Sequence, residues 1–300
     1  MQLIILGTDG LQRMDELSSG NTEKEKETNL SYSSIANRKK STWRDFLFKH
    51  EESLLAILML FIFSALWELI AVSGLVKPIF ISSPSHIFQA AVWLAGHGLW
   101  NDILVSLIEF AVGFLMAIVI AVPLGLLLGW YRRLNAMFDP FISALNATPR
   151  VALIPLIILW LGIGIESKIA VVFLGAFFPL ILNVMVGAKT VDSALLMCAR
   201  SFGASQYKVF ITLVLPTTLP FLIVGMRLAV GRALVGVVVA EMISSSAGLG
   251  HLIYITGSTF QTDKLFVGVL VLACFGYLLT EILKRLEAHF EIWRPERRQS

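Results

Sequence analysis

Six long apolar segments constrain this chain more than any other feature of its sequence. A bilayer core about 30 Å thick is crossed by about 20 helical residues, and no backbone polar group can stay unpaired there. Only 15% of the residues are charged and 56% are hydrophobic, whereas roughly 25% are charged in soluble proteins. The sequence therefore predicts an all-α membrane protein. The expected spans are Leu54–Val76, Ile103–Trp130, Val151–Ile165, Ala170–Ala188, Leu219–Ile243 and Leu265–Leu283.

The third of these spans is the shortest, because its charge-free run is bounded by Arg150 on one side and Glu166 on the other. A helix of that length does not cross the hydrocarbon core unaided. Three alternatives remain open: the helix starts earlier, it bends near Pro149, or neighbouring helices shield part of it.

The basic residues outside the spans predict the orientation, because Lys and Arg are retained in cytoplasmic loops. From Arg38 onward they gather before the first span and after the second, fourth and sixth spans, and the other connections hold only Lys77, Lys168 and Lys264. We therefore expect an even number of spans and both termini in the cytoplasm. The expected parts are a largely disordered cytoplasmic tail at 1–52, a six-helix transmembrane domain at 53–290 with a cytoplasmic loop at 189–220, and a basic cytoplasmic tail at 291–300.

Several kinds of function are excluded by what the sequence lacks. Cys198 and Cys274 have no zinc-ligand spacing and are too few for a disulfide framework, so no metal site is expected. The bases lie between apolar runs and do not form the stripe typical of nucleic-acid binding. Lys189 follows Gly187 and Ala188 without the upstream glycine of a phosphate-binding loop. The chain is therefore not expected to hydrolyse ATP or to hold a catalytic residue.

The loop between the fourth and fifth spans has the pattern of two short helices. Ala194–Phe202 has helical propensity, and its apolar residues recur on one face. Gly203 offers a left-handed stop, and Ser205 can cap a second helix that begins at Gln206. An apolar face outside the membrane needs a cover. Either it packs on this chain's own helix ends, or it docks a soluble subunit.

The spacing of this loop resembles a known family. Gly203, nine residues, and then Leu213-Val214-Leu215-Pro216 is similar to the "EAA" loop of permease subunits in ATP-binding-cassette importers. Other segments resemble the sulfonate, taurine and nitrate branch of these permeases: Ser83–Ser85, Pro123–Gly129, Pro149–Leu156, Leu161–Gly164, Ala240–Met242 and Gly248–Gly250. The resemblance covers roughly residues 52 to 290.

This resemblance implies a type I importer permease fold in the bacterial plasma (inner) membrane. The chain would form a homodimer with ATP-binding subunits, which hold the ATP and Mg, and with an extracytoplasmic substrate-binding protein. No cofactor is implied on this chain, and the implied solute is a small anion such as a sulfonate, taurine or nitrate. The residues implied to couple to the ATP-binding subunits are Met197, Cys198, Ala199, Phe202, Gly203, Leu213, Leu215 and Pro216.

Two positions depart from the family pattern. Met197 stands where most members have the glutamate of the loop, so docking here should depend more on shape and apolar burial. Glu109 stands near a position where an arginine is usual, so the charge pairing of the family is not transferred to this chain.

The fifth span carries small residues on one helical face. On an ideal helix of 100° per residue the positions that share this face are Gly225, Ala229, Ala233, Gly236 and Ala240. Small side chains let helices approach closely in lipid. Arg232 borders the face, whereas Arg227 and Glu241 point away from it and are expected to be structural charges. A charged residue at mid-membrane faces protein or a wet cavity.

Arg232 has two interpretations. It lines the solute pathway, where a guanidinium can counter the charge of an oxyanion, or it pairs with an acid such as Glu68 or Glu109. A different class of function also remains, an ion-coupled secondary transporter in which Glu68, Glu109 and Arg232 relay protons. That alternative predicts inverted internal repeats, which the sequence does not show, and it leaves the 189–220 loop unexplained.

Overall fold

The computed structural model describes residues 55–74, 76–77 and 79–290, so the predictions for residues 1–52 and 291–300 lie outside the described residues. The chain divides into two compact units, 1–67 and 68–300. The described part of the first unit belongs to the helix Leu55–Val72, which is long and apolar enough to cross a membrane. Apart from Ser64 and Glu68 its residues are apolar, as expected for a helix in lipid.

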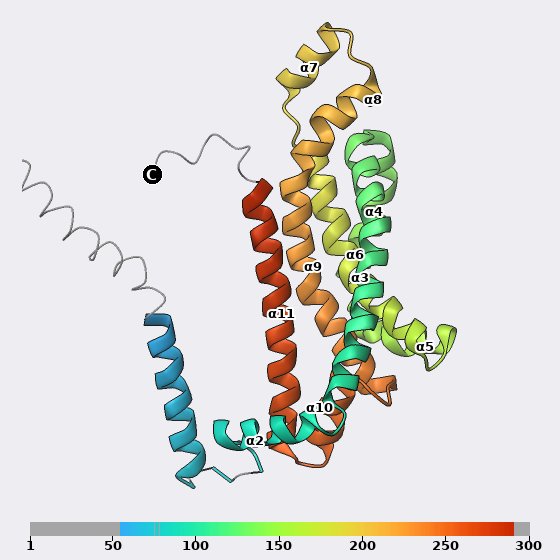
Figure 1. The fold of residues 1–300 in the computed structure, drawn as a ribbon. Helices are drawn as coiled ribbons and strands as arrows, with labels where there is room; N and C mark the ends of the chain where they lie inside the picture. The colour runs from blue at the N-terminus through green and yellow to red at the C-terminus, as the bar shows by residue number, and fades with distance from the viewer. Residues whose placement is uncertain (1–54, 75, 78, 291–300) are drawn as a thin grey trace, which may run out of the picture. The chain divides into compact units, whose positions relative to one another are not determined.

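The described part of the second unit is built from helices, without a strand among its residues (Figure 1). In chain order the elements are α2 (Pro84–Ala95), α3 (Leu99–Trp130), α4 (Arg132–Ala147), η1 (Arg150–Leu153), α5 (Ile154–Leu161), α6 (Ile165–Lys189), α7 (Ser193–Ser201), α8 (Gln206–Val209), η2 (Phe210–Val214), α9 (Leu215–Ser244), α10 (Leu249–Ser258) and α11 (Thr262–Phe290). Among them η1 is a 3₁₀-helix and η2 is a π-helix.

Helix α6 forms the centre of the bundle and packs most extensively on α9 and α3. Small residues make this possible. A side chain at Gly129 of α3 would place its Cβ 2.7 Å from the Met185 carbonyl oxygen of α6, and one at Gly175 of α6 would lie 3.0 Å from the Arg232 carbonyl oxygen of α9. The backbones are therefore in direct contact, as is usual where helices pack in lipid.

The small-residue face predicted for the fifth span is confirmed. All five of its residues are buried in α9: Gly225, Ala229, Ala233, Gly236 and Ala240. Gly225 lies against Asn183 and Gly236 against Val171, both from α6. This face therefore forms the contact between α9 and α6.

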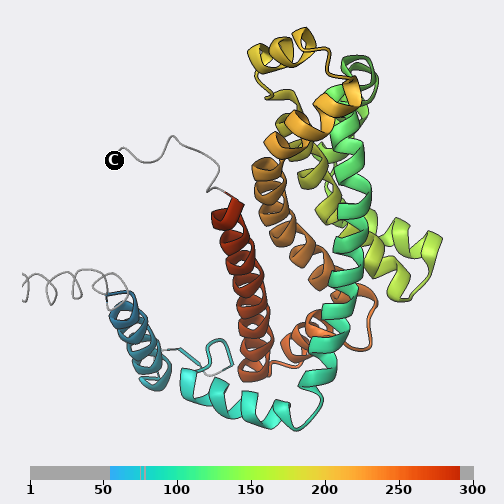
Figure 2. The same cartoon turned by 45° about the horizontal axis from the view of Figure 1, so that its top comes forward.

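The third span differs from the predicted Val151–Ile165 helix. Its helix starts earlier, at the beginning of α4, and breaks at Thr148 and Pro149, because a residue that precedes proline is disfavoured in a helix. α5 then ends at Gly162, which has a φ of +83°. The two halves, α4 and η1 with α5, are bent by 88°, and α5 projects from the bundle in both views (Figures 1 and 2). An earlier start and a bend near Pro149 are two of the three open alternatives.

The described residues thus contain five helices that are long and apolar enough to cross a membrane, or six if the bent pair counts as one span. When the bent pair is counted as the third span, the fifth span also differs from its predicted bounds. The sequence predicts a short helix at Gln206 that is separate from a span starting at Leu219, but one helix runs without a break over Gln206–Ser244. Pro216 has no amide hydrogen and cannot donate the usual helical hydrogen bond. The π-helical turn Phe210–Val214 before it accommodates this missing hydrogen bond without ending the helix.

Two helices outside the spans were not predicted. α2 begins after Ser83, whose hydroxyl accepts a hydrogen bond from the His86 amide at 3.3 Å, with Pro84 in the first turn. α10 follows Gly248, which has a φ of +110°. Serine followed by proline is a recognised start signal, so α2 could have been found from the sequence.

Candidate functional site

Helices α3, α9 and α11 run between two ends of the bundle, called here the α7 end and the α10 end after the short helix at each (Figure 1). Three places hold most of the residues singled out by the sequence. They are the α7 segment (residues 192–207), a hollow beside Arg232, and a buried polar cluster around Glu241 near the α10 end.

Local capping interactions build the α7 segment. The Asp192 carboxylate accepts a hydrogen bond from the Ala194 amide at 2.7 Å and starts α7. Gly203 follows the helix with a φ of +71°, in the left-handed region that disfavours a Cβ. The Ser205 hydroxyl then accepts from the Lys208 amide at 3.3 Å and starts α8. The predicted stop at Gly203 and the predicted cap at Ser205 are confirmed.

The α7 segment leaves apolar side chains uncovered by the described part of the chain. Phe202 is 87% exposed and Met197 63% exposed, and Leu195 and Tyr207 are also exposed. Cys198 is exposed as well. Four more residues were predicted to contact a soluble subunit. Ala199 and Leu213 are half-buried, and Leu215 and Pro216 are exposed in the first turn of α9.

Arg232 lines a hollow of about 600 Å³ between α4, η1, α6 and α9. Arg150 lines the same hollow from η1 and was not singled out as a site residue by the sequence. Its Nη2 donates to the Asn146 Oδ1 at 2.8 Å, and its guanidinium lies 5.2 Å from the centre of the Phe178 ring. No acidic side chain lines this hollow, and neither arginine forms an ion pair with a described residue. The hollow is therefore positively charged.

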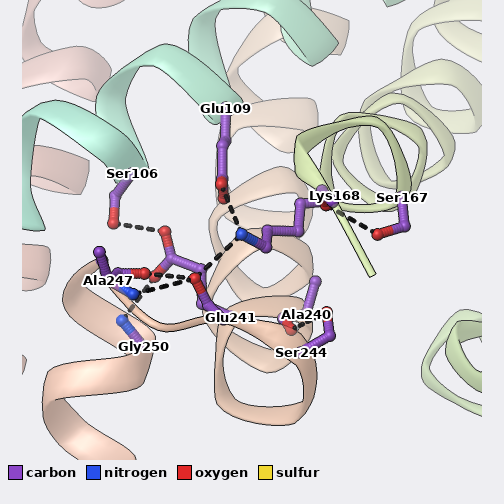
Figure 3. A network of polar contacts seen from close by, with 12 residues as sticks. Ser106, Glu109, Ser167, Lys168, Ala240, Glu241, Ser244, Ala247 and Gly250 are labelled. Atoms are coloured by element: carbon purple, nitrogen blue, oxygen red, sulfur yellow. Dashed lines mark hydrogen bonds and ion pairs between the residues drawn. The ribbon is translucent and has the colours of Figure 1, made fainter. Parts of the chain in front are cut away.

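Figure 3 shows the polar cluster near the α10 end, in which Ser106, Glu109, Lys168 and Glu241 are all buried. Glu241 is fully buried, and its carboxylate accepts from the Ser106 hydroxyl at 2.5 Å and from the Gly250 amide at 2.6 Å. The Ser106 oxygen in turn accepts from the Leu249 amide at 2.8 Å. The Gly248 amide also donates to Asp102 Oδ1 at 2.9 Å, so the loop that leads into α10 is held by two carboxylates and one hydroxyl from α3 and α9.

An ion pair completes this cluster. Lys168 Nζ of α6 lies 3.0 Å from Glu109 Oε1 of α3 and donates to the Ser245 hydroxyl at 2.9 Å. A buried charge without a partner is costly, so this pairing keeps both groups in the protein interior. The prediction that placed Lys168 in the connection between the third and fourth spans is wrong, because α6 starts at Ile165 and buries the lysine.

The segments Ala240–Met242 and Gly248–Gly250, noted separately in the sequence, form one contact. A Cβ on Gly250 would lie 2.8 Å from the Glu241 Cβ, so only glycine lets this loop approach the carboxylate. The positions on an ideal helix place Glu241 away from the small-residue face. They did not reveal its burial, because the partners of Glu241 come from α3 and α10.

The other charges of the spans have partners of their own. Arg227 forms an ion pair with Glu287 of α11. The Glu68 carboxylate accepts from the amide and the hydroxyl of Ser85. Glu109 pairs with Lys168, and Arg232 forms no ion pair with Glu109, Glu68 or another acid among the described residues.

Comparisons with known proteins agree with this architecture. Residues 121–292 match the family described as binding-protein-dependent transport system inner membrane component. The putative aliphatic sulfonates transport permease protein of Bacillus subtilis is 33% identical over 77% of this chain and 84% of its own length. The taurine transport system permease protein of Escherichia coli is 29% identical over 81% of this chain and 90% of its own.

The fold is also found among solved structures. A chain of the inward-facing MetNI methionine ABC transporter superposes with a TM-score of 0.54 at 20% identity, over 66% of this chain and 97% of that one. This likeness extends to the fold alone. The family match over 121–292 and the relative that is 33% identical show that the chain belongs to the permease family of binding-protein-dependent transport systems, the inner membrane components of ATP-binding-cassette importers.

Proposed function

We propose that this chain is the permease subunit of an ATP-driven importer that moves a small anionic solute, such as a sulfonate or taurine, into the cytoplasm. Two relatives that it resembles over most of its length are named for aliphatic sulfonates and for taurine. The positive charge of the hollow beside Arg232 favours the binding of an anion.

The observation that carries this proposal is the pair Arg150 and Arg232. They face one hollow without an acidic residue in its lining. Guanidinium groups bind sulfonate and carboxylate oxygens through paired N–H donors, so an anion in this hollow gains hydrogen bonds and charge compensation. Asn146 and Thr148 line the same hollow and add neutral polar groups for the rest of the solute.

A second copy of the chain is needed to enclose this hollow. Arg232 is exposed on the surface of the single chain, although it lines the hollow together with Val171 and Gly175 of α6. A charged group near the middle of a membrane span is stable only next to protein or water. A homodimer that closes over Arg232 provides both, and it forms a pathway between the two copies.

ATP-binding subunits dock on the α7 segment in this proposal. Its exposed residues include Met197, Cys198 and Phe202, which stand at the positions matched to the family loop. ATP and Mg belong to those partner subunits, and this chain has no cofactor and catalyses no reaction. Gly203 sets the direction in which α7 is presented, while Leu213, Leu215 and Pro216 begin the span that receives the motion.

The α7 end is cytoplasmic in this proposal, and the α10 end faces the substrate-binding protein outside the membrane. If α4, η1 and α5 count as one broken span, the described residues hold six spans. An even number of spans is consistent with both termini on one side. The Lys- and Arg-rich connections support the proposal that both termini, with the tails at 1–52 and 291–300, lie in the cytoplasm of the bacterium.

The secondary-transport alternative has less support. It needs Glu68, Glu109 and Arg232 to exchange protons. Glu109 is instead held by Lys168, and Arg232 pairs with neither acid among the described residues. ATP-dependent uptake in proteoliposomes without an ion gradient separates the two functions.

The test is uptake of labelled taurine and alkanesulfonates by proteoliposomes that hold this chain, its ATP-binding subunits and its binding protein. Arg232→Met should lower uptake by about tenfold or more, because charged hydrogen bonds to the anion are lost. Arg285→Met is the matched control, since Arg285 is exposed and its one ion pair with a described residue is that with Glu281 of its own helix. The recovery of ATP-binding subunits should stay the same in both variants, and unchanged uptake by Arg232→Met would refute the pathway role.

A further inference from the structure

A second hollow, of about 750 Å³, lies at the α7 end of the bundle and shares no residue with the one beside Arg232. It forms where α3 and α6 finish, where α4 starts, and where α7 covers them. The residues that matter here are Trp130, Tyr131, Arg132, Asn135, Lys189 and Arg200.

The charge of this second hollow is strongly positive. Arg132, Lys189 and Arg200 converge on it from α4, α6 and α7, and no acidic residue is part of its lining. None of the three forms an ion pair with a described residue. The nearest acid in the sequence, Asp192, is used to cap α7. Three cations that share one hollow without an internal counter-charge are stabilised by an anion.

Two further observations concern the kind of anion. Tyr131 and Arg132 at the start of α4 line this hollow, and the helix has no side-chain cap there, so the positive end of its dipole adds to the attraction for an anion. Asn135 lines the hollow too, and its Oδ1 is buried without a hydrogen-bond donor among the described residues. A ligand that carries a phosphate and a hydroxyl group would place the phosphate at the start of α4 and donate a hydrogen bond from the hydroxyl to Asn135 Oδ1.

The depth of the hollow indicates the source of that phosphate. Trp130 is the last residue of α3, a span that is apolar over most of its length, and Tyr131 follows it. Tryptophan and tyrosine concentrate at the level of the lipid headgroups. Basic hollows between helices at this level bind the headgroups of anionic lipids.

We propose that this second hollow binds the phosphate headgroup of an anionic phospholipid. The lipid joins the start of α4 to α7, because Arg132 and Arg200 hold the same phosphate. Leu196 and Arg200, four residues apart, turn one face of α7 to the hollow. Met197 and Phe202, which are exposed on the α7 segment, therefore stay free to contact a soluble subunit while the lipid is bound. This proposal does not depend on which solute is transported.

The test is native mass spectrometry of the purified full chain with phosphatidylglycerol or phosphatidylcholine added in detergent. The hollow variant carries Arg132→Gln, Lys189→Gln and Arg200→Gln. It should bind phosphatidylglycerol about 100-fold more weakly than the natural chain, since each cation near a headgroup adds a few-fold to its affinity. The control variant carries Arg133→Gln, Lys208→Gln and Arg285→Gln, removes the same charge outside the hollow, and should bind as the natural chain does.

Competition identifies the source of the phosphate. Inorganic phosphate and glycerol 3-phosphate, which lack acyl chains, should not displace phosphatidylglycerol at matched concentrations. Equal affinity of the hollow and control variants, or displacement by the soluble phosphates, would overturn the proposal. If the triple variant does not fold, Arg200→Gln alone serves, because Arg200 is exposed on α7 and its removal should still weaken lipid binding several-fold.

Discussion

Lys168 Nζ lies 3.0 Å from Glu109 Oε1, and the two side chains are 9% and 1% exposed. This ion pair joins α6 to α3 inside the bundle, and the second hydrogen bond of the lysine reaches Ser245 after α9. A buried pair of this kind contributes little net stability beyond an apolar pair, but the loss of one partner leaves the other charge uncompensated.

Lys168→Met should therefore lower the free energy of unfolding by about 3 to 5 kcal/mol, because Glu109 stays buried without its partner. The double variant Lys168→Met with Glu109→Met should recover most of that loss. Thermal unfolding of the detergent-purified chain measures both, with Lys284→Met as a control for the removal of an exposed lysine. A double variant no more stable than the single one would contradict this account.

Gly250→Ala should destabilise the cluster at the α10 end. Its Cβ would lie 2.8 Å from the Glu241 Cβ and 2.9 Å from Glu241 Oε2, so the loop must move and weaken the hydrogen bond to the carboxylate. We expect a loss of about 1 to 3 kcal/mol in the free energy of unfolding.

Gly231→Ala is the matched control for that change. Gly231 has no heavy atom within 4 Å of the added Cβ and lies in α9, so alanine there should be neutral or stabilising by up to about 1 kcal/mol. Equal melting temperatures of the two variants would show that the close contact at Gly250 has no energetic effect.

Phe202→Ser separates docking from folding. Phe202 is 87% exposed, so its replacement should change the free energy of unfolding by less than about 0.5 kcal/mol. The recovery of ATP-binding subunits with the affinity-purified chain should nevertheless fall several-fold, because an apolar contact is lost. Tyr254→Ser alters an exposed aromatic residue at the α10 end and should leave the recovery unchanged.

Met197→Glu should change how the docking of ATP-binding subunits depends on salt. The natural contact is apolar at this position, so subunit recovery should be the same at low salt and at about 1 M salt, where charges are screened beyond about 3 Å. A glutamate adds an electrostatic contact and should make the recovery decrease as salt rises. A natural complex that dissociates at high salt would show that charges dominate the contact even without this glutamate.

Local signals in the sequence predicted the parts of the fold that depend on few neighbours. Gly203 and Ser205 act through their own backbone and the next three residues, so the turn after α7 followed directly from the residue types. The small-residue face of α9 was equally predictable, because helical periodicity alone determines which residues share a face.

Contacts between distant segments were not predictable in this way. Lys168 reads as a loop residue when only the apolar run is counted, and its burial depends on Glu109, which comes from another helix. Arg150 reads as the boundary of a span, and it joins Arg232 only because the helix bends at Pro149. The link between Glu241 and Gly250 likewise requires the turn of the chain into α10.

The uninterrupted helix over Gln206–Ser244 has 39 residues, and at 1.5 Å per residue it is about 58 Å long, nearly twice the thickness of the hydrocarbon core. Its two ends belong to opposite surfaces of the bilayer. A tilt of about 10° about its midpoint would displace each end by about 5 Å in opposite directions. In the proposed importer, a pull on this helix at the cytoplasmic surface would therefore move its other end in the opposite direction at the outer surface.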